Sequence, residues 1–176
     1  MIRTAIAAVV LHCIILAVSP GAAQVVTLVR EDFENADFTG YSTLQNAFAI
    51  IGSDYFERGD NSLFTFDQDV TGYSGSNFIG LEDMDGAGLA DPHWLELDPI
   101  DVSGYKNLSV NLLVAAPNSL PTRYESNDFL RVEFDMDGGG YTIVGQFFGT
   151  GTGGSFQHDT NLDGIGDVPI NQAMQR

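Results

Sequence analysis

The sequence predicts an all-β protein, an antiparallel β-sandwich of the jelly-roll type. Short apolar runs are separated by Gly, Asp and Asn, and 20 of the 176 residues are glycine. No segment after Ala23 keeps a 3.6-residue apolar period for three turns, which argues against long helices. Many short strands divided by such turns are typical of sandwiches and jelly rolls.

The clearest strand signals lie in the second half of the chain. In ranges 107–114 and 128–135, apolar residues alternate with polar or charged ones, the pattern of a half-buried antiparallel strand. A third run covers 141–147, and the glycine-rich segment 137–140 before it supplies the positive φ values that a hairpin needs. Shorter apolar pieces predict further strands at 25–29, 48–51, 55–56, 63–66 and 77–81.

The N-terminus predicts a secretory signal peptide over residues 1–23. Arg3 precedes a continuous apolar run at 5–18, which is shorter than a bilayer span requires. Small residues precede an expected cleavage between Ala23 and Gln24. We therefore expect the remaining chain to be secreted or periplasmic and to have no further membrane span. An uncleaved N-terminal anchor is the alternative interpretation.

The predicted exported chain has no disulfide and a large negative charge. Cys13, the only cysteine, lies inside the signal segment, and the full sequence carries a net charge of −17. This charge argues against nucleic acid as a partner, because phosphate binding needs a basic face. It favours divalent cations that relieve self-repulsion, and Ca²⁺ is the oxygen-binding cation suited to an extracellular setting. The alternative is acidity that only maintains solubility.

We expect a β-sandwich domain at 24–148, followed at 149–176 by a Gly-rich linker, a calcium-type loop and a tail. In 159–167, oxygen-bearing side chains fall at alternate positions before a glycine, so that they can converge on one ion. The expected Ca²⁺ ligands are Asp159, Asn161, Asp163, the carbonyl of Ile165, and Asp167. The pattern resembles the calcium loops of dockerins and thrombospondin type 3 repeats. It departs from the EF-hand at the twelfth position, where Ile170 replaces the bidentate Glu. An Asx-rich surface turn is the alternative.

Two further acidic turns could also hold a cation. One contains Asp83 and Asp85, and the other contains Asp135 and Asp137. Each alternates acidic with apolar residues and ends in glycine. Each is equally well explained as an ordinary acidic hairpin turn.

Several short motifs follow one another along the chain: Glu31-Asp32-Phe33-Glu34, the ranges 78–86, 95–104 and 107–115, and 128–132 with 137–139. In this order they resemble the jelly-roll modules of secreted bacterial proteins related to MAM and laminin-G-like domains. The resemblance spans roughly 30–144 and implies a structural calcium near the opening acidic strand, at Asp32, Glu34 and Asp128. A jelly roll usually ends with a strand that returns to the middle of a sheet. No segment after Asp167 predicts that strand, so we expect either a shortened chain or a weak tail in its place.

The expected function is a binding or adhesive role toward an extracellular glycan or protein. Exposed aromatic residues such as Trp94 could stack on sugar faces, although most aromatic residues are expected in the core. The alternatives are a hydrolase, or a fragment of one, acting on polysaccharide, and a structural spacer of a larger surface protein. Glu133, Asp135 and Asp137 could share one strand face, but the second Glu of a retaining glycosidase is absent. Catalysis is therefore not predicted.

Overall fold

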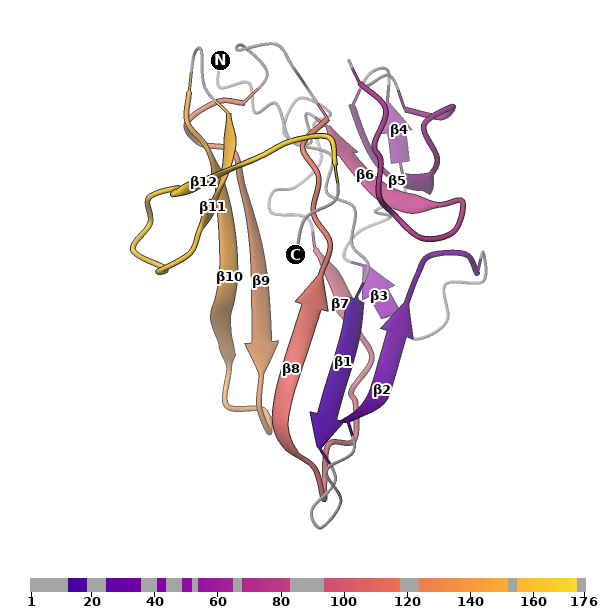
Figure 1. Cartoon of the computed structure of the whole chain (residues 1–176), viewed down its shortest axis with the longest axis vertical. Helices are drawn as coiled ribbons and strands as arrows, with labels where there is room; N and C mark the ends of the chain where they lie inside the picture. Colours follow the sequence, from indigo (N-terminus) through magenta and orange to yellow (C-terminus); the bar gives the residue numbers. More distant parts are fainter. Residues whose placement is uncertain are drawn as a thin grey trace.

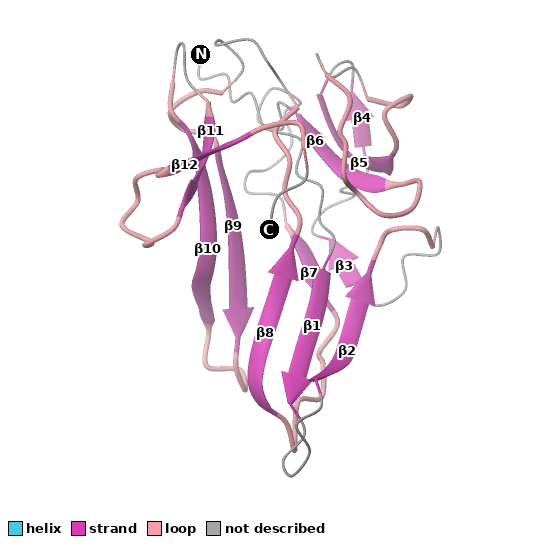
Figure 2. Cartoon of the chain, viewed as in Figure 1, coloured by secondary structure: helices cyan, strands magenta, loops and turns pink. Residues whose placement is uncertain are grey.

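The computed structural model describes residues 13–18, 25–35, 41–43, 49–51, 54–64, 68–82, 94–117, 124–151 and 155–173. In these ranges every regular element is a strand, and every pairing within a sheet is antiparallel (Figure 2). The predicted all-β, antiparallel class is thereby confirmed. Across the same ranges, no helix has the length and apolar character needed to cross a membrane.

The described strands form four sheets (Figure 1). Their order is β2-β1-β8, β12-β11-β10-β9, β3-β7 and β4-β5-β6. The strands are β1 (Cys13–Val18), β2 (Val25–Glu31), β3 (Tyr41–Thr43), β4 (Ala49–Ile51), β5 (Asp54–Gly59), β6 (Phe78–Glu82), β7 (Leu95–Leu97), β8 (Lys106–Leu112), β9 (Phe129–Asp135), β10 (Tyr141–Gly149), β11 (Phe156–Asp159) and β12 (Val168–Ile170).

The C-terminal sheet is built on the hairpin of β9 and β10. Positive φ values at Asp137 (58°), Gly138 (74°) and Gly140 (101°) form its turn, as the glycine-rich segment predicts. β11 pairs with the end of β10, and β12 pairs with β11. No pattern in the sequence predicted these last two strands, which carry the chain's tail into the same sheet.

The N-terminal sheet has β1 at its centre. β1 pairs antiparallel with β2 on one side and with β8 on the other. It lies inside the segment that the sequence predicts to be a signal peptide. β2 and β8 therefore each have one edge bonded to a strand that the exported chain is expected to lose.

Two buried clusters hold the sheets together. One contains Val114, Ala116, Tyr124, Phe147, Phe156 and Ile170. The other contains Phe64, Val70, Phe78 and Ala115. The segment after β8 contributes to both clusters, because successive residues of an extended chain point to opposite sides. The tail bonds to Ala116 of the first cluster and to Thr71, the residue after Val70 of the second: Ala116 N donates to Asn171 O at 2.8 Å, and Thr71 N donates to Gln172 O at 3.0 Å.

Two of the expected strands differ from the structure. The range 107–114 ends as a strand at Leu112, and Val110 is exposed although Leu108 and Leu112 are half-buried. In the expected strand 63–66, the described residues form a turn, because the Asp60 carboxylate accepts hydrogen bonds from the amides that follow it. Residues 65–67 lie outside the described ranges.

Candidate functional site

The predicted calcium-type loop connects β11 to β12. Asp159 is the last residue of β11, and Asp167 precedes β12. Asp167 N donates to His158 O at 2.8 Å, and the Asp167 carboxylate accepts hydrogen bonds from Thr160 N (2.9 Å) and Thr160 Oγ1 (2.7 Å). These contacts close the neck of the loop. Positive φ values at Leu162 (61°) and Gly164 (89°) then turn the chain back on itself.

Asp159 is fully buried at the base of this loop. Its carboxylate accepts hydrogen bonds from Gly164 N (2.7 Å), Asp163 N (3.2 Å) and Gln146 Nε2 (2.7 Å). Burial raises the pKa of Asp159, but these donors outweigh burial and bring its pKa below the ordinary value. The carboxylate is therefore held ionised, and Gln146 ties it to β10.

Asn161 and Asp163 are drawn into the same small network. Asp163 N donates to Asn161 Oδ1 at 3.0 Å as well as to Asp159. The Asp163 carboxylate accepts hydrogen bonds from Ile165 N (2.9 Å) and Asn161 Nδ2 (3.2 Å). The structure thus brings together three of the five predicted ligand residues. The Ile165 side chain is exposed, which is compatible with a role for its carbonyl only.

The donor set of the loop fits a hard cation. Three carboxylates, one side-chain amide and the backbone carbonyls offer only oxygen, and 159–167 contains no basic residue. Each ionised carboxylate has about four lone-pair sites, so it can accept an N–H bond and still ligate an ion. Across the described residues, no group of three His, Cys, Asp or Glu side chains is arranged to hold a metal ion. A site here would therefore depend on Asn161 and on the backbone carbonyls.

The opening acidic segment has a different arrangement. The Glu34 carboxylate accepts hydrogen bonds from Ser76 N (2.6 Å), Asn77 N (2.7 Å) and Asn77 Nδ2 (3.2 Å). Gly75, at φ 88°, lies so close that an added Cβ would be 2.4 Å from Glu34 Oε1. Burial raises the pKa of Glu34, but the hydrogen bonds lower it by more, so the pKa lies below its ordinary value. Glu34 thus holds the loop before β6.

Arg58 completes this arrangement from β5. Its Nε donates to Phe33 O, and its Nη2 donates to Glu34 O at 2.9 Å. Phe33 has a positive φ of 58° and is buried, and the Asp32 carboxylate lies 3.6 Å from Arg30 Nε. The role of Arg58 was not predictable from the sequence, because nothing local to Phe33 indicates a partner 25 residues away.

Within the described part of the chain, the remaining candidate ligands do not gather into one site. Asp128 is buried, with Oδ2 accepting a hydrogen bond from Glu125 N at 2.8 Å. The Asp135 carboxylate accepts one from Gly140 N at 3.1 Å, which is a turn-capping contact. β9 ends at Asp135 and Asp137 lies in the turn, so Glu133, Asp135 and Asp137 do not form a row along one strand face. Asp83 and Asp85 lie outside the described residues.

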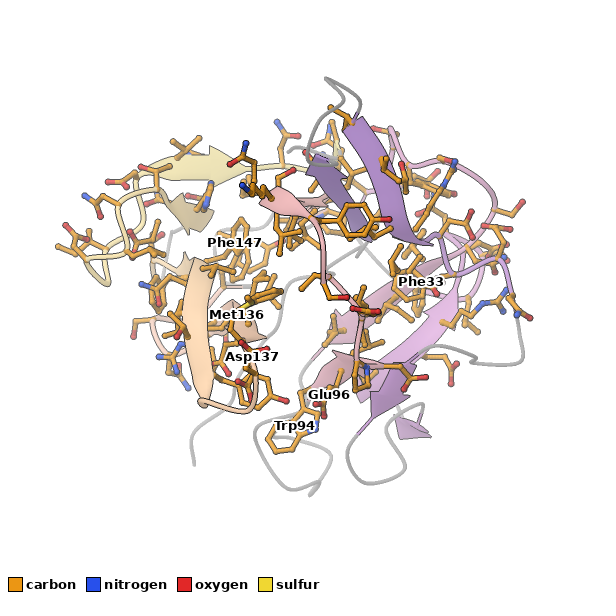
Figure 3. All side chains as sticks on the ribbon, turned by 90° about the horizontal axis from the view of Figure 1, so that it is seen from below. Phe33, Trp94, Glu96, Met136, Asp137 and Phe147 are labelled. Carbon is orange, nitrogen blue, oxygen red and sulfur yellow. The ribbon has the colours of Figure 1, made fainter. Side chains whose placement is uncertain are left out.

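An exposed aromatic group lies between two sheets. Tyr141 OH, at the start of β10, donates to Glu96 Oε1 on β7 at 2.5 Å. Trp94, directly before β7, is 46% exposed, Tyr141 is 58% exposed and Met136 is 49% exposed. Figure 3 shows Trp94 and Glu96 on one segment and Met136 and Asp137 on the hairpin, and the Tyr141–Glu96 hydrogen bond joins the two. The hydrogen bond to Glu96 raises the pKa of Tyr141, as do burial and the neighbouring carboxylates. The sequence could not predict this pairing, which joins residues 45 positions apart.

Searches against protein-family models, curated proteins and solved structures returned no match to this chain. The resemblance to MAM and laminin-G-like modules and to dockerin-type loops therefore stays a prediction from the sequence motifs.

Proposed function

We propose that the chain is a secreted, Ca²⁺-binding β-sandwich module with a binding or adhesive role. The ion would occupy the loop 159–167, with Asp159, Asn161, Asp163, Asp167 and the carbonyl of Ile165 as its ligands. The observation that carries this proposal is the buried, ionised carboxylate of Asp159, which shares one hydrogen-bonded network with Asn161 and Asp163. Its charge is compensated by three hydrogen-bond donors, which fix this carboxylate in one place beside Asn161 and Asp163.

Calcium would act on this loop mainly through stability. Three carboxylates lie within nine residues and repel one another, and a divalent cation converts that repulsion into attraction. β11 and β12 leave the loop carrying Phe156 and Ile170, both of which are in a buried cluster. Fixing the loop therefore also fixes the two strands that deliver these core residues.

Thermal melting with calcium and with a chelator tests the proposal. A ligand that binds only the folded state, at a hundredfold excess over its Kd, stabilises by about 2.7 kcal/mol. For a domain of this size that corresponds to a rise in Tm of about 5 to 10 °C. We expect the rise to disappear in Asp163→Ala, whose carboxylate is at the exposed side of the network. An unchanged Tm in the unaltered protein would contradict the calcium proposal.

Glu133→Gln provides the matched control. Glu133 is an exposed acid on β9, outside the loop, and the substitution removes one negative charge without changing its shape. We expect this variant to keep the full calcium-dependent rise, which separates site binding from general neutralisation of charge. The same variant tests the hydrolase alternative, because polysaccharide hydrolysis that is lost on Glu133→Gln would favour it.

The target-binding role is assigned to the exposed aromatic residues Trp94 and Tyr141, together with Met136 and Glu96. Exposed apolar side chains gathered at one place often mark an interaction site. Aromatic rings beside a carboxylate suit a sugar, whose apolar face stacks on a ring while its hydroxyl groups donate hydrogen bonds. Trp94 is the only tryptophan, so its fluorescence reports directly on this surface. We expect soluble polysaccharides that bind the protein to change this fluorescence, and Tyr141→Ala to weaken the binding. Binding with unchanged fluorescence would contradict this assignment.

A further inference from the structure

The central strand of the N-terminal sheet is supplied by the segment that export is expected to remove. β1 pairs with β2 through Cys13–Glu31 to Val18–Val25, and with β8 through Cys13–Leu112 to Val18–Lys106. Ile15, for example, lies between Val29 and Val110. The six residues of β1 are therefore bonded along both edges, and no other described strand separates β2 from β8.

Loss of β1 would leave β2 and β8 facing each other across a gap. Neighbouring strands are about 4.8 Å apart, so the backbones of β2 and β8 would be separated by roughly 10 Å. That distance is too long for direct hydrogen bonds between β2 and β8, and it leaves room for one strand between them. Unpaired strand edges are templates for pairing with another chain, and adding a strand is a recurrent mode of peptide recognition.

The gap has a defined register. The pairing with β2 shifts between Ile15 and Leu16, and the pairing with β8 shifts between Leu16 and Val18. The second shift falls next to Asn107, which has a positive φ of 55°. Irregularities of this kind bend a strand and fix its register, so the two edges accept an incoming strand in one alignment only.

The flanking side chains indicate what would fill the gap. The apolar residues in register with β1 are Val25, Val26 and Val29 of β2 and Val110 and Leu112 of β8, and the charged ones, Arg30, Glu31 and Lys106, lie toward the strand ends. Cross-strand neighbours stabilise a sheet when both are apolar or β-branched. The segment that fills the gap here has the sequence CIILAV and carries no charge.

We propose that the gap between β2 and β8 is an acceptor site for an extended, apolar peptide strand about six residues long that runs antiparallel to both. Cys13–Val18 fills it before signal cleavage, and an apolar strand from another polypeptide fills it afterwards. The second step rests on the proposed export of the chain. The first step does not, because the pairing of β1 is independent of where the chain is delivered.

A nicked form of the full chain tests the acceptor site. A protease site is inserted between Val18 and Val25, and the purified protein is cleaved in the presence of calcium. We expect the N-terminal fragment to stay bound through size-exclusion chromatography. A fluorescent peptide with the sequence of 13–18, carrying Cys13→Ser, should then replace the bound fragment. The same peptide should raise the Tm of cleaved protein from which the fragment has been removed.

Two peptide variants provide matched controls that leave the protein unchanged. Ile15→Pro removes a backbone donor from the ladder, and Ile15→Lys keeps the donor but introduces a charge. We expect both to bind at least tenfold more weakly. Dissociation of the fragment on nicking, with no binding of the unaltered peptide, would show that β2 and β8 close without a strand and would overturn the proposal. Equal binding of the proline variant would overturn it too.

Determining the N-terminal residue of the exported protein tests the second step of this proposal separately from the proposed function. A chain that begins at Gln24 supports filling by another polypeptide, whereas a chain that retains 13–18 overturns that step and leaves the exchange result standing. If the exported chain forms dimers that the peptide dissociates, the strand comes from a second copy, which overturns the assignment to a different polypeptide. The calcium melting experiment has an independent readout and is decided separately.

Discussion

Gln146 connects the candidate loop to the centre of the C-terminal sheet, and its replacement by methionine isolates one interaction. The side chain is buried on β10, and its Nε2 donates to Asp159 Oδ2 at 2.7 Å. Methionine has a similar length and volume, so Gln146→Met removes the donor without opening a cavity. A hydrogen bond to a charged group contributes about 1.5–3 kcal/mol. We expect the free energy of unfolding to fall by that amount.

Urea unfolding in the presence of a chelator measures this loss. With an m-value of about 2 kcal/mol/M, the midpoint should fall by roughly 1 M while m is unchanged. Gln157→Met is the matched control, because Gln157 Nε2 donates to the neutral Ser155 Oγ at 3.2 Å rather than to a carboxylate. We expect that variant to lose less than about 1 kcal/mol. Equal midpoint shifts for the two variants would refute the view that Asp159 depends on Gln146.

Calcium should reduce the effect of Gln146→Met. An ion bound at the Asp159 carboxylate compensates part of its charge, so the missing donor matters less. We therefore expect a smaller loss of stability in calcium than in chelator, measured by the same urea midpoints. A loss of stability that is identical in calcium and in chelator would show that the ion does not bind at the Asp159 carboxylate.

Two further outcomes follow from the same contacts. Folding lowers the pKa of Asp159 from 3.8 and the pKa of Glu34 from 4.5, so both ionised carboxylates stabilise the folded state above those values. This stabilisation is lost as the pH falls through the lowered pKa of each group. The urea midpoint should therefore stay constant from pH 7 to about 5 and fall steeply below about 4. Gly149→Ala should destabilise by about 1–3 kcal/mol, because its Cβ would lie 2.0 Å from Glu125 O, whereas Gly145→Ala on the same strand meets only Val132 at 3.7 Å and should show little steric penalty in the same unfolding assay.

Sequence pattern predicted the elements whose signal is local. The hairpin of β9 and β10 follows from two alternating runs around a glycine-rich turn, and the structure forms it with positive φ values at the expected positions. The Asp, Asn and Gly residues of 159–167 likewise predicted a turn, and the structure forms one with hydrogen bonds from its backbone amides to Asp159, Asn161 and Asp163. Both depend on residues close in sequence, so alternation and turn chemistry are sufficient to indicate them.

Pattern failed where long-range packing decides. β11 and β12 are only four and three residues long, and their strand state depends on the pairing of β11 with β10 and of β12 with β11 rather than on any periodicity of their own. The bonds from Ser76 and Asn77 to Glu34 span more than forty residues. Val110 fits the apolar alternation of its strand, yet its side chain is exposed. Burial requires another element packed over that position, and the alternation of residues in one strand carries no information about such an element.

The candidate loop lies at the junction of the elements that sequence could not predict, which gives it structural importance beyond its own nine residues. β11 and β12 deliver Phe156 and Ile170 to the cluster that also contains Phe147 of β10, whose ring stacks with that of Phe156 at 6.2 Å. Directly after β12, Asn171 bonds to Ala116 beside the same cluster. The loop therefore sets the spacing of two strands that have little intrinsic preference to pair. A bound cation would strengthen this connection between the last β-strand and the core, in a sequence whose only cysteine lies in the predicted signal segment.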